Sequence, residues 1–329
     1  MRLTIGATPI PTNIILAPLS GCSDLAFRLI ARECGAKLCF FEMVDAHSLL
    51  GPHPKKFNIL RTVPQDTPIA AQLVGEDPGI MLEAAQILLA HVPVVLLDIN
   101  SACPVKKVVK KRAGAALLKD PQTLSQIIST LASSLPIPVT VKLRIGYSQV
   151  DIPALRDLVK ACEASGAAAL FVHGRTRDQG YAGDINYQAL HAVKSAVTIP
   201  VVGSGNIFSG PLAKQMLDQT GCDGVLVARG AFGNPWIFEE IEAYLRDGTL
   251  PPERSLRQIH TVLKRHLAYI AQYKTASPAG KIGFMRKVVL WYLKGFPHAS
   301  KLRGQINRIT DYEALLVFLD EHLLQEAQE

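Results

Sequence analysis

The sequence lacks any long hydrophobic run: no stretch approaches the roughly 20 consecutive apolar residues that are needed to span a membrane. Residues 1–6 also lack the long apolar segment and the small-residue cleavage site of a secretory leader. We therefore expect a cytoplasmic protein without a membrane anchor.

Cysteine is scarce and is not arranged for metal binding. The six cysteines contain no CxxC pair, which argues against a zinc ribbon and against a thioredoxin-type motif, so no metal site is expected. In a large cytosolic protein free thiols are the default, and most of these side chains should be small buried hydrophobic groups. Cys103 differs from the others because it directly follows a predicted strand.

Acidic residues are nearly absent from residues 251–308, which carry twelve Lys and Arg and a single acid, Glu253. Residues 309–329 reverse this pattern, with six acids and no Lys or Arg. The net charge of +7 therefore gathers in one segment, which indicates an anionic partner. Because 48% of the residues are hydrophobic and only 19% are charged, the chain can bury a large core, and disorder is not expected.

Short apolar runs alternate with amphipathic stretches up to about residue 235. The runs are nearly continuous in apolar character, as in strands that are buried on both faces of a parallel sheet. Strands are predicted at 14–19, 38–44, 69–74, 94–99, 139–145, 168–173, 201–204 and 224–229, and helices at 24–34, 79–91, 121–134, 152–165 and 210–219. Eight strands separated by helices predict a (β/α)8 TIM barrel.

A doubly wound sheet is the alternative for this alternation. It normally has a GxGxxG turn after its first strand, whereas this chain reads Ala17-Pro18-Leu19-Ser20-Gly21 there. From about residue 236 the strand signal stops, and helical periodicity covers 256–273, 280–294 and 312–325. We therefore predict an α/β protein with a barrel at 1–240 and a small helical domain at 241–329.

Polar side chains recur at the carboxyl ends of the predicted strands, where barrel enzymes place their active sites. They include Ser20, Glu42, Asp45, Gln72, Asn100, Cys103, Lys142, Arg144, His173, Ser204, Asn206 and Arg229. Gln72 and Lys142 lie inside strands and need partners, because burying an unpaired polar group costs free energy. For Lys142 two interpretations stay open: a salt bridge to a neighbouring strand, or contact with a bound anion or electron-rich cofactor.

The last two predicted strands end in a pattern typical of a phosphate site. Gly203-Ser204-Gly205-Asn206 lets backbone N–H groups approach a ligand closely, and Gly230 opens a helical turn whose N-terminus favours an anion. Arg229 can add a charge-assisted contact. Since these two strands usually form the phosphate site of this fold, we expect a cofactor or substrate phosphate there.

Cys103 lies in the segment Asp98-Ile99-Asn100-Ser101-Ala102-Cys103-Pro104, at the expected mouth of the barrel. A structural cysteine, a nucleophile and a proton donor are the possible roles. A nucleophile usually needs a nearby base or a lowered pKa, and no His is adjacent in this segment, which favours a general acid.

Five cations follow within residues 106–112: Lys106, Lys107, Lys110, Lys111 and Arg112. Such a run is either a solvated face or a grip on a polyanion beside the reaction centre. Its position three residues after Cys103 favours the second interpretation.

Taken in order, these motifs resemble the tRNA-dihydrouridine synthase family, and its B-type branch most closely. The matching segments are Ala17-Pro18-Leu19-Ser20-Gly21 with Asp24 and Phe27-Arg28, the Cys103 segment with the lysine-rich stretch through Leu118, Lys142-Leu143-Arg144-Ile145-Gly146, Val172-His173-Gly174-Arg175-Thr176-Arg177 with Gln179-Gly180-Tyr181, and Gly233-Asn234-Pro235-Trp236-Ile237-Phe238. Three positions depart from the family: it usually has Gly where Ala102 stands, Asn-Gly-Asp where Ser204-Gly205-Asn206 stands, and Gly-Arg where Ala228-Arg229 stands.

The resemblance implies a barrel that binds FMN, takes electrons from NADPH (or NADH) and reduces the C5–C6 double bond of uridines in tRNA. Cys103 would donate a proton to C5 while reduced FMN gives hydride to C6. The residues in contact with FMN would be Pro18, Leu19, Ser20, Gln72, Lys142, His173, Ser204, Gly205, Asn206, Ala228 and Arg229. Asn100, Arg144, Arg175 and Arg177, with the cations of 106–112, would lie toward the target base and the RNA.

Three other functions stay open at this point. The substrate could be ribosomal RNA, or the chain could be an FMN barrel oxidoreductase that acts on a free small molecule such as dihydroorotate or a dihydropyrimidine. It could also be an RNA-binding protein on a barrel that has lost its chemistry. The basic tail and the lysine-rich run favour RNA over a free small molecule.

Overall fold

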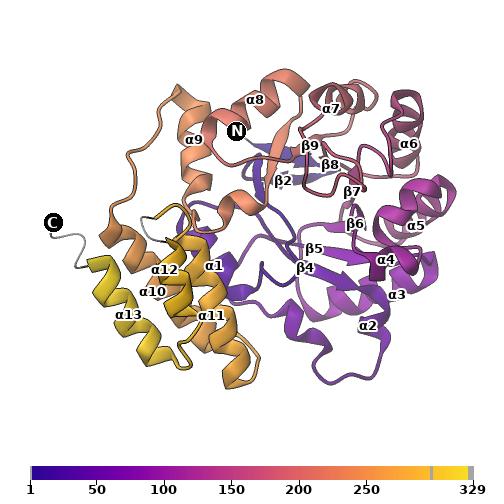
Figure 1. The fold of residues 1–329 in the computed structure, drawn as a ribbon. Coiled ribbons are helices and arrows are strands. Elements are labelled where there is room, and N and C mark those ends of the chain that lie inside the picture. Colours follow the sequence, from indigo (N-terminus) through magenta and orange to yellow (C-terminus); the bar gives the residue numbers. More distant parts are fainter. Residues whose placement is uncertain (1, 297–298, 325–329) are drawn as a thin grey trace.

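A closed barrel of eight parallel strands forms the centre of the molecule, in a computed structural model that describes residues 2–296 and 299–324 (Figure 1). The strand order around the barrel is β10-β3-β4-β5-β6-β7-β8-β9. The strands are β3 (Ile14–Leu16), β4 (Cys39–Asp45), β5 (Ile69–Val74), β6 (Leu97–Ser101), β7 (Val139–Arg144), β8 (Leu170–His173), β9 (Val201–Ser204) and β10 (Gly224–Val227). The predicted TIM barrel is confirmed, and the doubly wound alternative is excluded because this sheet closes on itself.

Two strands differ most from the prediction. The first strand ends at Leu16 rather than at residue 19, just ahead of Pro18, which has no N–H to donate to a neighbouring strand. The fourth strand begins at Leu97 and continues through Asn100 and Ser101, whereas the prediction ended it at residue 99. Asn100 is tolerated within the strand because its side-chain amide is fully engaged in hydrogen bonds.

A hairpin that was not predicted plugs the amino-terminal end of the barrel. Strands β1 (Leu3–Ile5) and β2 (Thr8–Ile10) pair antiparallel. Their apolar side chains pack against inward-facing residues at the start of the strands, such as Leu38 and Leu96. Higher in the barrel, Phe40 and Phe171 meet edge to face, with ring centroids 5.5 Å apart. The interior is therefore filled from this end, which leaves the carboxyl ends of the strands for a site.

Helices cover the outside of the barrel (Figure 1). They are α1 (Leu25–Glu33), α2 (Ala46–Leu50), α3 (Pro78–His91), α4 (Lys106–Lys110), α5 (Pro121–Ser134), α6 (Ile152–Ala164), α7 (Tyr187–Lys194), α8 (Gly210–Thr220) and α9 (Ile237–Asp247), with 3-10 turns η1 (Lys56–Leu60), η2 (Gly114–Lys119) and η3 (Arg229–Ala231). Asp77, Asp120 and Asp151 each cap a helix by accepting a backbone N–H, and a proline follows in the first turn. These caps explain why the helices begin close to where the sequence predicts them.

Four further helices form a separate bundle beside α1 (Figure 1). They are α10 (Leu256–Tyr273), α11 (Pro278–Tyr292), α12 (Ala299–Ile306), which was not predicted, and α13 (Tyr312–Leu324). The predicted end of the last helix at residue 325 lies outside the described residues. The bundle has its own apolar core, which includes Leu267, Val288 and Leu319. The fold class is thus an α/β barrel followed by a helical segment, as predicted.

Helix α9 crosses the predicted domain boundary at residue 240. Its buried side chains Ile237, Phe238 and Ile241 belong to the core that surrounds the barrel. The division of the chain at this residue stays a prediction. Within residues 2–296 and 299–324, no helix combines the length and apolar character required to cross a bilayer.

Candidate active site

A cavity of about 470 Å³ opens at the carboxyl ends of the barrel strands, within the usual range for small-ligand sites. All the residues predicted to contact FMN line it: Pro18, Leu19, Ser20, Gln72, Lys142, His173, Ser204, Gly205, Asn206, Ala228 and Arg229. Cys103, Asn100 and Arg144 line the same cavity. The structure therefore brings together side chains from strands and loops that are far apart in the sequence.

Glycines shape the end of the cavity that follows β9 and β10. A Cβ on Gly205 would lie 2.3 Å from the Ile185 side chain, and one on Gly230 would lie 2.0 Å from the Ile207 carbonyl oxygen. Gly205 also has a φ of +125°. Only glycine fits both positions, so backbone rather than side chains forms this wall. Such a wall is suited to a ligand phosphate.

Arg229 lies at the rim of the same end. Its guanidinium carbon is 4.4 Å from the ring centroid of Tyr181 and 5.7 Å from that of Phe208. Both aromatic side chains are exposed and line the cavity. Cation–π contacts hold the charge beside the glycine wall, where it can meet an anionic group.

Lys142 projects from β7 into the cavity. It makes no hydrogen bond or ion pair with any residue in the described part of the chain, so the alternative of a salt bridge to a neighbouring strand is not realised there. Burial and the nearby Arg144 charge lower the pKa of Lys142 to about 8, while Asp98 and Cys103 act in the opposite direction. A half-buried ammonium group without an acceptor is costly, and it fits contact with an electron-rich or anionic ligand.

The Cys103 side chain is half-buried in the loop after β6. Burial raises the pKa of its thiol above the ordinary value, although the Val105 backbone N–H and the Arg144 and Lys142 charges lower it. The thiol is therefore protonated at neutral pH. This state suits a proton donor better than a nucleophile, which must be a thiolate.

Asn100 fixes the turn that presents Cys103. Its Oδ1 accepts hydrogen bonds from the backbone N–H groups of Ala102, at 3.0 Å, and Cys103, at 2.8 Å. Its Nδ2 donates to Gln72 Oε1 at 2.8 Å. Asn100 thus positions the cysteine loop, in addition to lining the cavity.

The arginines that were predicted to face RNA occupy different kinds of position in the structure. Arg144 lines the cavity and ties two loops together, since it donates to the carbonyl oxygens of Ala102 and Thr176. Arg175 is 2% exposed, lies outside the lining and donates to Gly183 O and Asn206 Oδ1. It therefore holds the loop around the cavity from within.

Arg177 pairs with the neighbouring Asp178 at 2.7 Å and lies 5.2 Å from the ring centroid of Tyr147. It does not line the cavity either. The roles of Arg144, Arg175 and Arg177 toward RNA stay predictions.

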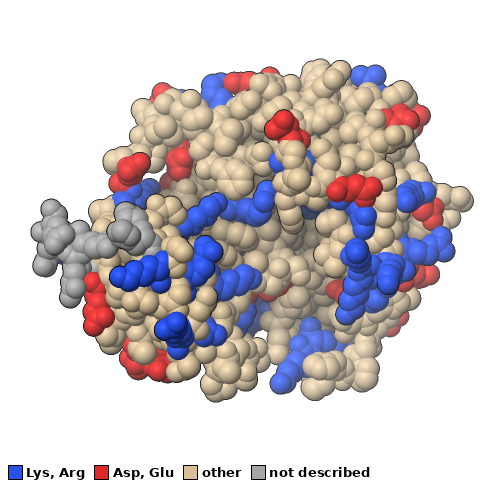
Figure 2. All heavy atoms as spheres, in the orientation of Figure 1, with Lys and Arg blue, Asp and Glu red and all other residues tan. Residues whose placement is uncertain are grey.

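The lysine-rich run forms α4 and the turn after it, beside the cavity. Lys106, Lys107 and Lys110 are exposed, whereas Lys111 pairs with Asp45 at 2.9 Å and Arg112 lies 3.6 Å from Asp120. Figure 2 shows Lys and Arg gathered over α4 on one side of the visible face and over the C-terminal bundle on the other, with the surface hollowed between them. This arrangement suits a large polyanion that spans both.

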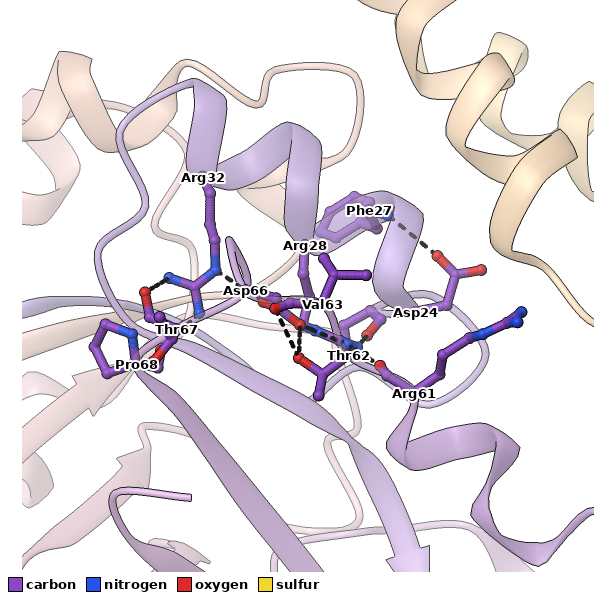
Figure 3. Close-up of polar contacts among 11 residues, drawn as sticks. Asp24, Phe27, Arg28, Arg32, Arg61, Thr62, Val63, Asp66, Thr67 and Pro68 are labelled. Atoms are coloured by element: carbon purple, nitrogen blue, oxygen red, sulfur yellow. Dashed lines mark hydrogen bonds and ion pairs between the residues drawn. The ribbon is translucent and has the colours of Figure 1, made fainter. Parts of the chain in front are cut away.

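A buried cluster of ion pairs holds the loop after β3 in place (Figure 3). The Arg28 guanidinium pairs with Asp66 at 2.8 Å and also donates to the carbonyl oxygens of Ser23 and Arg61. Arg32 pairs with the other Asp66 oxygen at 2.8 Å. The Phe27-Arg28 motif therefore anchors the segment that carries Pro18, Leu19 and Ser20, rather than contacting a ligand.

Several lining residues were not predicted as site residues. Met43, Cys22, Phe208 and Phe232 line the cavity. The other site residues were predicted because polar side chains recur at the strand ends. These four residues do not show that pattern. Tyr181 also lines the cavity and lies in a segment that the family resemblance includes.

Comparison with known proteins adds independent information. The family model described as Dihydrouridine synthase (Dus) matches residues 15–328. The chain is 37% identical over 310 residues to tRNA-dihydrouridine synthase B of Pseudomonas aeruginosa, covering 94% of this chain and 92% of the relative. It is 35% identical over 312 residues to a probable tRNA-dihydrouridine synthase of Rickettsia conorii, with the same coverage of 94% and 92%. Among solved structures, the old yellow enzyme of Trypanosoma cruzi shares the fold, with a TM-score of 0.57, 13% identity and coverage of 84% of this chain and 98% of that one.

Proposed function

The chain belongs to the dihydrouridine synthase family, and we propose that it is a tRNA-dihydrouridine synthase, which uses bound FMN and NADPH (or NADH) to reduce the C5–C6 double bond of uridines in tRNA. The full-length similarity to relatives that are named for this activity supports the proposal. We also propose that the protein acts in the cytoplasm, where tRNA is available.

One observation carries the proposal. The protonated thiol of Cys103 and the residues proposed to hold FMN face a single cavity at the carboxyl ends of the barrel strands. A flavin nucleotide fits this lining because the glycine wall with Arg229 suits its phosphate. The ammonium group of Lys142 suits the electron-rich ring, and it has no other partner among the described residues.

The chain's own groups supply the remaining chemistry. Reduced FMN, when bound, would supply hydride to C6 of the uracil, with NADPH as the source of the electrons. Cys103 donates its proton to C5, and the resulting thiolate recovers a proton from solvent. Lys142 stabilises negative charge that develops during the transfer, because a cation that is partly shielded from water interacts more strongly than one in water.

RNA recognition has to offset the cost of exposing the base. A uridine stacked inside tRNA cannot enter a cavity of this kind, so it must be extruded at a cost of about a few kcal/mol. Phosphate contacts with Lys106, Lys107 and Lys110 on one side, and with the basic helices of the C-terminal bundle on the other, can provide that energy.

Mapping dihydrouridine by mass spectrometry tests the proposal. RNA from cells with and without the gene would be compared, with tRNA and ribosomal RNA analysed separately. We expect the modification to disappear from defined tRNA positions and to return when the gene is restored. Loss confined to ribosomal RNA would show that the substrate is ribosomal RNA and not tRNA. Unchanged modification in both pools would contradict the proposal.

A further inference from the structure

Asp98 is a fully buried carboxylate that lies outside the cavity lining. It sits on β6 between Gln72 of β5 and Thr140 of β7, which are its register partners on the two neighbouring strands. Gln72 Nε2 donates to its Oδ2, and Thr140 Oγ1 donates to its Oδ1, both at 2.7 Å. Burial raises the pKa of this carboxyl, against the effect of the two hydrogen bonds and of the Lys142 charge.

A continuous chain of hydrogen bonds joins Asp98 to the cysteine loop. Gln72 donates to Asp98 through Nε2 and accepts from Asn100 Nδ2 through Oε1. Asn100 then accepts the backbone N–H groups of Ala102 and Cys103 through Oδ1.

The groups at the two ends of this series of hydrogen bonds fix which group donates and which accepts in each of them. The loop N–H groups can only donate, so Asn100 must turn its oxygen toward them and its NH2 toward Gln72. Gln72 must then offer its oxygen to Asn100 and its NH2 to the residue at position 98. That residue must accept, and a carboxyl group accepts from Gln72 whether or not its other oxygen carries a proton.

We propose that Asp98 is a positioning residue, which sets the orientation of the Gln72 and Asn100 amides and thereby holds the Cys103 loop in the geometry for proton donation. The inference rests on the proposed function for its consequence in catalysis. The hydrogen-bond chain itself does not depend on which substrate binds.

A leucine at position 98 removes the acceptor and keeps a side chain that branches at Cγ. Gln72 would then have no acceptor for its NH2 group at this site, and a flipped amide would turn its NH2 against the NH2 of Asn100. Thr140→Val is the matched control, because it is isosteric, alters the other side of the same carboxylate and leaves the chain to Cys103 intact.

Hydrogen exchange at the amides of Ala102 and Cys103 in the flavin-loaded protein measures the effect directly. In Asp98→Leu we expect exchange at these two amides to accelerate about tenfold, the effect of weakening one hydrogen bond, while Thr140→Val exchanges like the wild type. RNA-driven oxidation of the reduced flavin should slow in Asp98→Leu more than its reduction by NADPH. Unchanged exchange in Asp98→Leu would overturn the proposal.

A polarity swap keeps the test decisive if Asp98→Leu does not fold. In Asn100→Asp the loop still meets an acceptor, but Gln72 now faces a carboxylate on each side, so protection at Ala102 and Cys103 should fall. Adding Asp98→Asn lets Gln72 flip, since the amide introduced at position 98 can donate to Gln72 while accepting from Thr140, and protection should return. Equal loss of protection in the single and double variants contradicts the proposal.

The exchange measurement uses no RNA, so its outcome is separate from that of the proposed function. Wild-type protein that forms no dihydrouridine would defeat the function and leave the hydrogen-bond chain standing.

Discussion

Trp291 of α11 stacks on Phe232, with ring centroids 4.3 Å apart and ring planes inclined by 5°. Phe232 lines the cavity directly after η3, which carries Arg229. The next residue, Gly233, has a φ of +74°, and a Cβ there would lie 2.1 Å from the Trp291 carbonyl oxygen. The C-terminal bundle therefore supports the wall of the cavity, in addition to any contact that it makes with RNA.

Trp291→Ala should weaken FMN binding, because Phe232 loses the ring that holds it against the cavity wall. An aromatic pair of this kind contributes roughly 0.5–1.5 kcal/mol beyond its buried area, so we expect up to about a tenfold rise in the Kd for FMN. Titration of flavin-stripped protein by fluorescence quenching measures it, with Trp291→Phe as the control that keeps a stacked ring. Equal FMN affinity in Trp291→Ala and the wild type would show that the stack does not support the site.

The exposed lysines of α4 should contribute to RNA binding mainly through charge. Replacing Lys106, Lys107 and Lys110 together with Ala should lower tRNA affinity and reduce the salt dependence of log K by about 0.7–0.9 for each phosphate that is no longer neutralised. Reduction of the flavin by NADPH should be unaffected. Lys214→Ala removes an exposed lysine on α8 that is paired with Asp218, and it should leave the salt slope as it is. An unchanged salt slope in the triple variant would mean that these lysines face solvent and contact no phosphate.

Asp66→Ala should be strongly destabilising. It leaves the guanidinium groups of Arg28 and Arg32 without their partner, and Arg28 and Asp66 are both completely buried. Removing one partner of a buried ion pair costs about 3–5 kcal/mol, which urea unfolding would detect as a lower midpoint. Asp218→Ala, which breaks an exposed pair, should cost less than about 0.5 kcal/mol. Similar losses in the two variants would contradict the role given to the cluster in Figure 3.

His266 should make the protein less stable in acid. Its ring is buried between the bundle and α1 and contacts the Tyr292 hydroxyl at 3.2 Å. Burial lowers the pKa of His266 from 6.5 to about 4, although Asp24 raises it. Between these two pH values the unfolded chain binds a proton that the folded protein excludes. The stabilisation is therefore complete above pH 6.5 and declines as the pH falls toward 4.

Between pH 7 and pH 5 this group alone should remove about 2 kcal/mol of the free energy of unfolding. Urea unfolding at the two pH values gives the free energy of unfolding of the wild type and of His266→Gln. The contribution of His266 is the difference between the two proteins in how much this free energy changes with pH. The variant should lose less stability than the wild type over this interval. The same loss in both proteins would assign the acid sensitivity to other groups.

The barrel could be predicted because strands buried on both faces are nearly continuous in apolar character, as at 14–16 and 224–227. The hairpin of β1 and β2 could not, since strands of three residues are too short to show a period. Helices α7 and α12, with eight residues each, were missed for the same reason.

Most of the cavity could be predicted because barrel strands present their carboxyl ends at one mouth, so polar residues at those ends must converge. Charge alone did not reveal where Arg175 points, because its burial depends on the fold of the loop from Gly174 to Ile185. Asp98 and Phe232 became visible only through cross-strand register and through packing against a helix that lies far along the chain.

The most direct test of the central claim follows the two half-reactions of Cys103→Ala separately. The flavin-loaded variant would be reduced by NADPH without oxygen and then mixed with unmodified tRNA, while flavin absorbance and dihydrouridine are recorded. We expect reduction by NADPH at the wild-type rate and uridine reduction slower by about 10²–10⁴-fold, the usual contribution of a general acid. Formation of dihydrouridine by the variant at the wild-type rate would contradict the assignment of Cys103 as the proton donor.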